Sequence, residues 1–328
     1  MPPIPVVITE PEYRKAQDAF DSSTDVTVTV VAPDEDAVVK GIEASQAWAA
    51  ILGVEHYAEA LYSALPRGGI IARFGVGHDG IDKRKASDSG LFVTNTPGVL
   101  EGAVAEHTLA LMLGLVKGIS DFSASVAEKR WCPKQTSELR GKRLAVLGCG
   151  AIGRQVARTA AYGFGMDVVG LDVVREAEDE LRANWGVARF TTDFADAVAE
   201  ANIISLHVPA TAENHHLIRM ETISLFAPGA MLINTARGAI IDEISLYDAL
   251  RNGALAAAAL DVFESEPYTP RTPEKDLREL PNVLLTPHVS SATREACNRV
   301  AEAALRNVRE ARAGNVTALD LLNSDMIS

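Results

Sequence analysis

The chain has 328 residues, of which 47% are hydrophobic and 23% are charged, and this balance excludes an intrinsically disordered protein. A formal net charge of −13, without a concentrated stripe of Lys and Arg, argues against a surface that binds nucleic acid. The three cysteines are widely scattered, so neither a disulfide framework nor a metal site is predicted. The length favours two domains.

The N-terminal residues contain no basic segment followed by an apolar core, so we expect no secretory signal. The most apolar helical stretch, residues 109–116, is too short to cross a bilayer. These features predict a cytoplasmic protein that has no membrane contact.

In the first part of the chain, short apolar runs alternate with helical patterns, which is typical of βαβ units and a parallel sheet. Strands are predicted at 6–9, 26–31, 48–52, 70–74 and 91–94, with helices at 34–41, 55–65 and 81–87. A long helix rich in Ala and Leu is predicted at 101–119. The polar residues 120–142 are predicted to be irregular.

A second series of such units begins at Leu144. Strands follow at 168–171, 203–206, 231–234, 258–260 and 283–285, and helices at 152–161, 176–183, 243–252 and 292–313. Since no Gly/Ser-rich linker separates the halves, we expect the chain to cross between domains at the helices 101–119 and 292–313. The predicted fold is therefore α/β, with two Rossmann-like parallel-sheet domains. A discontinuous substrate domain (1–100 and 292–328) would surround an inserted dinucleotide-binding domain (101–291), with a cleft between them.

A Gly-x-Gly-x-x-Gly motif joins the apolar run at 143–147 to the helix that follows. Gly148 would permit the tight turn, Gly150 would let the backbone approach a pyrophosphate, and Gly153 would let helix and strand pack closely. The next apolar run ends at Asp172, 19 residues after Gly153, where a carboxylate can accept hydrogen bonds from the adenosine ribose. Together these features predict dinucleotide binding.

The same turn bears on cofactor choice. The carboxylate of Asp172 would repel the 2′-phosphate of NADP, so NAD is favoured, although Arg175 could soften this preference by reaching toward a phosphate. Cys149, inside the turn, is interpreted as a small filler residue and not as a redox group.

Four polar residues lie just beyond predicted strands and should converge at one sheet edge: Arg237, Asp261, Glu266 and His288. Transfer of a hydride between a nicotinamide and a carbonyl needs a cation that holds and polarises the carbonyl, and Arg237 supplies a planar fork of donors. It also needs a group that titrates near neutrality, for which His288 is suited. A carboxylate such as Glu266 can orient that histidine.

Taken together, these segments resemble the D-isomer-specific 2-hydroxyacid dehydrogenase family, which includes glyoxylate/hydroxypyruvate reductases and phosphoglycerate dehydrogenases. The resemblance covers essentially the whole chain. It is carried by residues 73–82, 95–98, 104–108, 234–238, 261–267 and 287–288, in the family's order and spacing.

The resemblance implies that Arg237 binds the substrate carboxylate and carbonyl, that His288 is the acid/base, and that Glu266 pairs with it. The amides of Val76 and Gly77 would hold the substrate carboxylate from the other domain. The residues expected to contact NAD are Gly148, Gly150, Ala151, Ile152, Gly153, Asp172, His207, Thr235, Ala236, Arg237, Asp261, His288, Ser290 and Ser291, with Thr108 nearby. A homodimer is also implied, with the helix 101–119 and the following segment at the contact.

The chain departs from the family pattern in places. It has Gly80 where many members have asparagine, it lacks the asparagine common after Gly98, and residues 53–55 offer no arginine to grip a phosphate. A small unphosphorylated 2-keto acid, such as glyoxylate or hydroxypyruvate, is therefore favoured over 3-phosphoglycerate.

Other interpretations stay open at this point. A non-catalytic NAD(H)-sensing protein, like the corepressor relatives of the family, would carry the same motifs, and phosphite or formate could be oxidised on the same scaffold. His215 and His216 lack metal-site spacing and are interpreted as a surface feature at a helix start. Glu264 is expected to be a solvated loop acid. Trp131 and Phe122 are expected to cover the interdomain cleft or a subunit contact.

Overall fold

The computed structural model describes residues 2–175 and 178–327, and the chain forms two compact units. The first unit consists of residues 1–100 and 292–328, and the second of residues 101–291. Each unit is built on its own parallel sheet, so the predicted fold class of two parallel-sheet α/β domains is confirmed.

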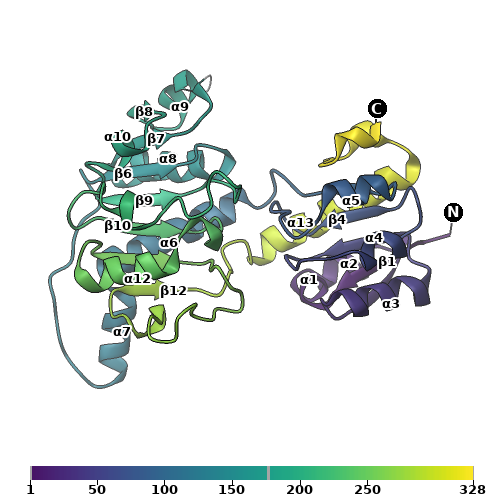
Figure 1. Ribbon diagram of the computed structural model, residues 1–328, viewed down its shortest axis with the longest axis horizontal. Helices are drawn as coiled ribbons and strands as arrows, with labels where there is room; N and C mark the ends of the chain where they lie inside the picture. The colour runs from purple at the N-terminus through teal and green to yellow at the C-terminus, as the bar shows by residue number, and fades with distance from the viewer. Residues whose placement is uncertain (1, 176–177, 328) are drawn as a thin grey trace. The chain divides into compact units, whose positions relative to one another are not determined.

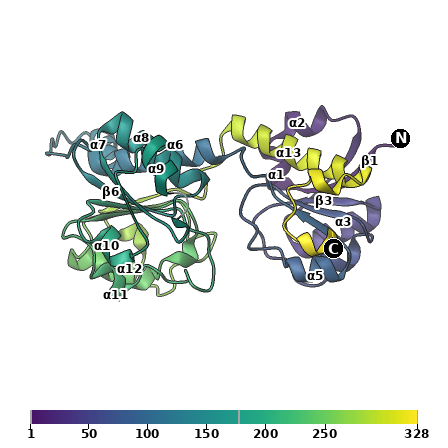
Figure 2. The same cartoon turned by 90° about the horizontal axis from the view of Figure 1, so that it is seen from above.

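The first unit contains a five-stranded sheet in the order β2-β1-β3-β4-β5. Its strands are β1 (Ile4–Thr9), β2 (Val26–Val31), β3 (Ala49–Leu52), β4 (Ile70–Arg73) and β5 (Phe92–Thr94). Its helices are α1 (Glu10–Lys15), α2 (Gln17–Asp21), α3 (Glu35–Ser45), α4 (Ala60–Ala64), α5 (Lys83–Asp88) and α13 (Arg294–Ala313). Within this unit, α1, α2 and α13 lie on one side of the sheet and α3 and α5 on the other (Figure 2).

The second unit contains a seven-stranded sheet in the order β12-β11-β10-β9-β6-β7-β8. Its strands are β6 (Arg143–Leu147), β7 (Asp167–Leu171), β8 (Arg189–Thr191), β9 (Ile203–Leu206), β10 (Met231–Asn234), β11 (Ala257–Leu260) and β12 (Val283–Leu285). Its helices are α6 (Glu101–Lys117), α7 (Ile119–Ala127), α8 (Ala151–Phe164), α9 (Glu178–Asn184), α10 (Phe194–Val198), α11 (Met220–Ile223) and α12 (Glu243–Asn252) (Figure 1).

Helices cover both faces of the second sheet, which is why its central strands are continuous apolar runs. Strands β9 and β11 are buried along their whole length. On one face α6 and α8 pack together, and on the other α10 and α12 bury a separate cluster that includes Leu232 and Leu246. Both faces are visible in Figure 2. The strand ends that carry the predicted site are thus fixed by a closed core.

The sequence expectations were wrong in detail for residues 101–142 and for residues 55–65. The helix predicted at 101–119 ends at Lys117 because Gly118 adopts a left-handed conformation (φ 60°), and a second helix, α7, occupies part of the segment predicted to be irregular. The helix predicted at 55–65 is shorter in the structure, where only α4 (Ala60–Ala64) is helical. The carboxylate of Glu35 accepts hydrogen bonds from the amides of Ala58 and Leu61 and so holds the preceding residues in a loop. The helix predicted at 176–183 is present as α9 in the described residues, and residues 176–177 lie outside them.

No single helix in the described part of the chain is both long and apolar enough to span a membrane. Helices α6 and α7 reach that length and hydropathy only when taken together, and they are bent by 62° where they meet.

Candidate active site

The glycine-rich turn between β6 and α8 has the close approaches that the motif requires. Gly148 has φ +99°, and a Cβ there would lie 2.5 Å from the carbonyl oxygen of His207. A Cβ on Gly153 would lie 1.9 Å from the carbonyl oxygen of Gly148, so helix and turn can meet only at glycine. Space beside Gly150 is open, and Ala151 and Ile152 begin the helix. The turn therefore leaves free space at a helix N-terminus, where an anion is favoured.

Asp172 lies directly beyond β7 and faces this turn. Its Oδ2 accepts a hydrogen bond from the amide of Cys149 at 2.7 Å, and its Oδ1 accepts one from the amide of Val173 at 2.7 Å. Arg175 donates to the hydroxyl of Thr192 at 3.0 Å, which holds its guanidinium near β8. The carboxylate is thus positioned beside the turn, as a dinucleotide site requires.

Cys149 is buried within the turn. Burial, together with the nearby charge of Asp172, raises the pKa of its thiol to about 12, so the reactive thiolate is not formed near neutral pH. Its sulfur instead occupies the space beside Gly170, since a Cβ on Gly170 would lie 2.8 Å from that sulfur. This is the role of a small filler residue.

The loop after β10 carries Arg237. Asn234, the last residue of the strand, is buried; its side chain donates to the carbonyl of Arg237 at 2.8 Å and accepts from the amide of Ala236 at 3.0 Å. Arg237 Nη1 also donates to the Ala236 carbonyl at 2.7 Å. A Cβ on Gly238 would lie 1.8 Å from the carbonyl carbon of Phe263, so this turn lies directly against the loop after β11.

The loops after β11 and β12 bring Glu266 and His288 together. His288 Nδ1 lies 2.6 Å from Glu266 Oε2, with the two side chains 29% and 30% exposed, and the other carboxylate oxygen accepts from the amide of Phe263 at 3.0 Å. Burial alone would raise the pKa of Glu266, but the contact with His288, the amide of Phe263 and the charge of Arg237 together lower it. Glu266 is therefore a carboxylate at neutral pH and can orient an imidazole.

Asp261 is fully buried and holds the turn that carries His288. Its carboxylate accepts from the hydroxyl of Thr286 at 2.6 Å and from the amides of Val289 and Ser290 at 2.9 and 2.8 Å. Its carbonyl accepts from the amide of His288, whose φ is +52°. In this structure the carboxylate of Asp261 therefore binds the histidine turn, a function that the sequence did not indicate.

His107 also contacts this network, although the sequence alone indicated no function for it. Its Nε2 lies 3.1 Å from the hydroxyl of Thr286 and 3.6 Å from Asp261 Oδ1. In the same helix, the hydroxyl of Thr108 lies 2.8 Å from that of Thr235. The only sequence signal for these contacts is the motif at 104–108, since α6 is distant in the chain from β12.

The remaining predicted residues lie in two places. His207 follows β9, and its Nε2 lies 2.8 Å from the hydroxyl of Ser205, while Ser291 ends the second unit. Val76 and Gly77 belong to the first unit, in the loop after β4. That loop is held by Asn95, which donates to the Val76 carbonyl at 2.8 Å.

Two minor expectations were wrong. His216 is not at a helix start, since α11 begins at Met220; its ring stacks on His215 with centroids 3.9 Å apart and its Nε2 contacts the carboxylate of Glu264. Glu264 is not a solvated acid, because its side chain is 10% exposed and also pairs with Arg271 at 3.2 Å. The contact between His216 and Glu264, 48 positions apart in the chain, underlies both errors.

The structure gives a physical reason for one departure from the family pattern. A Cβ on Gly80 would lie 2.1 Å from the carbonyl oxygen of Glu55, and the amide of Tyr57 donates to the carbonyl of Gly80 at 3.2 Å. The two loops are in backbone contact, so an asparagine at position 80 would push them apart.

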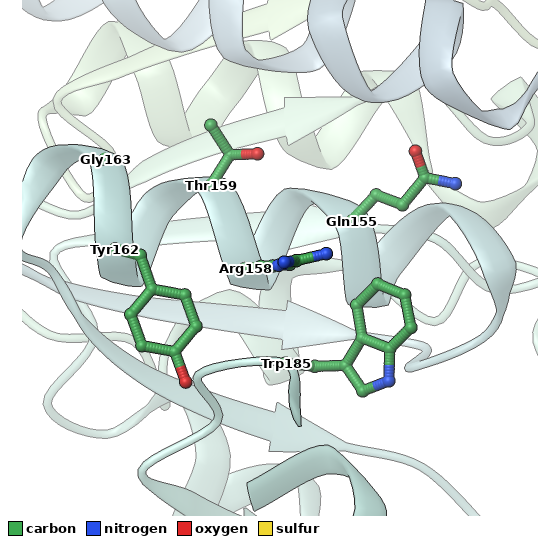
Figure 3. Close-up of a pocket in the computed structure, with 6 residues that line it drawn as sticks. All are labelled: Gln155, Arg158, Thr159, Tyr162, Gly163 and Trp185. Carbon is green, nitrogen blue, oxygen red and sulfur yellow. The ribbon is translucent and has the colours of Figure 1, made fainter. Parts of the chain in front are cut away.

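An open pocket of about 610 Å³ lies on the outer side of α8. Figure 3 shows the side chain of Arg158 between those of Tyr162 and Trp185, and the guanidinium carbon lies 5.9 Å from the centroid of the indole ring. Gln155, Thr159 and Gly163 complete the lining. None of the predicted site residues lines this pocket. Across the described ranges, no group of three or more His, Cys, Asp or Glu side chains could hold a metal ion.

Comparison with known proteins identifies the family. Residues 109–290 match the model of the D-isomer specific 2-hydroxyacid dehydrogenase, NAD binding domain. A glyoxylate reductase of Thermococcus litoralis is 38% identical over 274 residues, which are 80% of this chain and 79% of the relative.

Two solved structures share the fold. D-lactate dehydrogenase from Aquifex aeolicus, complexed with NAD and lactic acid, has a TM-score of 0.84 at 30% identity and covers 97% of this chain and 99% of its own. An NADPH-dependent glyoxylate/hydroxypyruvate reductase from Sinorhizobium meliloti has a TM-score of 0.79 at 26% identity, with 94% and 93% covered. The chain therefore belongs to the D-isomer-specific 2-hydroxyacid dehydrogenase family and is an oxidoreductase that uses a nicotinamide cofactor.

Proposed function

We propose that this enzyme uses NADH to reduce a small, unphosphorylated 2-keto acid to the D-2-hydroxy acid, with His288 as the acid/base. The observation that carries the proposal is the 2.6 Å contact between His288 Nδ1 and Glu266 Oε2, beside the charge of Arg237. A histidine whose one nitrogen is held by a carboxylate can present the other nitrogen to a reacting oxygen.

In this scheme the proton moves at Nε2 of His288. During reduction that nitrogen donates a proton to the carbonyl oxygen, and Glu266 stabilises the protonated ring beforehand. Arg237 would bind the keto acid through its carboxylate and carbonyl, because a guanidinium offers paired donors in one plane. The amides of Val76 and Gly77 would hold the substrate carboxylate as well.

The residues of the glycine-rich turn, together with Asp172, would hold the dinucleotide, and the nicotinamide supplies the hydride when it is bound. The open space at Gly150 and the placement of Asp172 beside the turn support this assignment. Asp172 favours NAD, since a carboxylate repels a 2′-phosphate, and Arg175 is held at Thr192. The remaining contacts are those expected from the sequence, from Thr108, His207, Thr235, Ala236, Asp261, Ser290 and Ser291.

For the substrate, we favour glyoxylate or hydroxypyruvate. Residues 53–55 provide no arginine for a distal phosphate, and a relative that is 38% identical is a glyoxylate reductase. We also propose a cytoplasmic location, which suits a protein whose three cysteines form no disulfide within the described residues.

The test is oxidation of NADH, with NADPH in parallel, in the presence of glyoxylate, hydroxypyruvate, pyruvate and 3-phosphohydroxypyruvate. We expect the highest kcat/KM with NADH and one of the first two compounds. Preference for the phosphorylated acid would overturn the substrate assignment. Saturable NADH binding without turnover of any keto acid would favour the sensing function instead.

We further propose a homodimer formed through the second unit. On α7 and the segment after it, Ile119 is 58%, Val126 57% and Trp131 85% exposed in the single chain. Large apolar side chains that are exposed close together along one segment are typical of a protein contact. Light scattering should give twice the chain mass of 35.0 kDa, and a monomer mass at micromolar concentration would contradict the proposal.

A further inference from the structure

The loop that carries Glu266 packs directly against the turn after β10. Gly238, directly after Arg237, lies so close that a Cβ there would meet the carbonyl oxygen of Phe263 at 2.0 Å and the amide nitrogen of Glu264 at 2.4 Å. Glu266 lies three positions after Phe263, and its carboxylate accepts a hydrogen bond from the Phe263 amide. Any shift of this loop therefore moves the carboxylate that faces His288.

Glu243, the first residue of α12, holds the same loop through a hydrogen bond. It is only 6% exposed, and its Oε1 accepts a hydrogen bond from the amide of Glu264 at 2.8 Å. Its Oε2 is buried and has no hydrogen-bond partner among the described residues. Burial, and after it the charges of Glu264 and Asp242, raise the pKa of Glu243 against the opposing effect of the Glu264 amide and Arg271. Since a buried carboxyl group that is only half satisfied destabilises a fold, its presence calls for a function.

The side chain of Glu264 provides the second anchor. Its carboxylate contacts Nε2 of His216 and also pairs with Arg271 at 3.2 Å. Glu264 is thus held at its amide by a helix residue, and at its carboxylate by His216 from a distant loop and by Arg271 from its own loop. Two residues further along is Glu266.

We propose that Glu243 is a positioning residue for the reduction: through the amide of Glu264 it holds the loop that aims Glu266 at His288. This inference rests on the proposed function of the His288–Glu266 pair. A residue at the start of a packed helix is a rigid support, and misplacement of a catalytic group by about 1 Å can reduce a rate by about 10²-fold.

The experiment compares three variants of the full chain. Glu243→Leu removes the acceptor for the Glu264 amide and fills the buried position with an apolar side chain. Glu243→Gln keeps an acceptor. Ser245→Ala is the matched control, because Ser245 donates to Asp242 at 2.6 Å at the start of the same helix and has no bond to the Phe263–Glu266 loop. For each variant, kcat with the preferred keto acid is measured as a function of pH, together with the Kd for NADH and the circular dichroism spectrum.

We expect Glu243→Leu to lower kcat by about 10- to 100-fold, with the Kd for NADH within about twofold of the wild type. Its pH profile should also differ from that of the wild type, because a loosened Glu266 no longer holds Nδ1 of His288. Glu243→Gln should restore most of kcat, and Ser245→Ala should keep the wild-type profile even where it lowers stability.

The inference is wrong if Glu243→Leu folds and retains both the kcat and the pH profile of the wild type. If that variant does not fold, Glu243→Met removes the acceptor with a flexible side chain of similar length, and an unchanged kcat and pH profile there would also overturn the inference. Failure of the proposed function has a different signature, since the wild-type enzyme itself would then turn over no keto acid.

Discussion

At the scale of single residues, the assignment depends on His288 and its carboxylate partner. Replacing His288 with alanine removes the proton donor but leaves the glycine-rich turn and Asp172 in place. We therefore expect kcat to fall by about 10²-fold or more, a typical magnitude for loss of general acid–base catalysis. NADH affinity, measured by fluorescence titration, should stay near the wild-type value. Turnover close to normal would remove His288 from its proposed function.

Arg237 offers a second residue-scale test, which separates the shape of the cation from its charge. Arg237→Lys keeps the positive charge but replaces a planar fork of donors with a single ammonium group. If the guanidinium binds carboxylate and carbonyl together, kcat/KM should fall by about 10²-fold, in line with loss of a bidentate ionic contact of about 3 kcal/mol. A change below about threefold in steady-state assays would mean that charge alone is needed there.

At the scale of elements, the turn between β6 and α8 depends on how closely a helix can approach it. Gly153→Ala would place a methyl group 1.9 Å from the Gly148 carbonyl oxygen, so the helix or the turn must move. We expect the Kd for NADH to rise at least about 10-fold and stability to fall by about 1–3 kcal/mol. Gly163→Ala is the matched control in the same helix, because its methyl group would meet only Thr159 at 3.6 Å. This control should keep NADH affinity, and equal losses in both variants would show that the effect is general to the helix.

The elements also show how far a sequence predicts structure. Strands β9 and β10 begin and end at their predicted bounds, because a strand buried inside the sheet has a sharp hydrophobic boundary. The short helices α1, α2, α10 and α11 were missed, because each is only one or two turns long and is stabilised by tertiary packing. In the site, the proximity of Glu266 to His288 could be predicted, because both residues lie beyond the ends of neighbouring parallel strands. The bonds from Asp261 to the histidine turn and from Glu243 to Glu264 join loops whose proximity no local pattern encodes.

At the scale of the whole molecule, the partly buried imidazole of His207 links folding stability to pH. Burial lowers the pKa of His207 to about 4 in the folded protein, against about 6.5 in an unfolded chain. Between these values the unfolded state binds a proton that the folded state does not, so the free energy of unfolding decreases as the pH falls below about 6.5. From pH 7 to pH 5 this single group should destabilise the fold by about 2 kcal/mol.

The variant His207→Gln isolates that contribution, because every other titrating group is common to both proteins. Urea unfolding at pH 7 and pH 5 should show a loss of stability about 2 kcal/mol smaller in the variant than in the wild type. At pH 7 the linkage contributes almost nothing, so any difference there reports the lost contact with Ser205 and not the proton. The same pH dependence in both proteins would mean that His207 remains accessible to protonation in the fold. In that case the polar turn after β9 would be open to water in the protein without its cofactor.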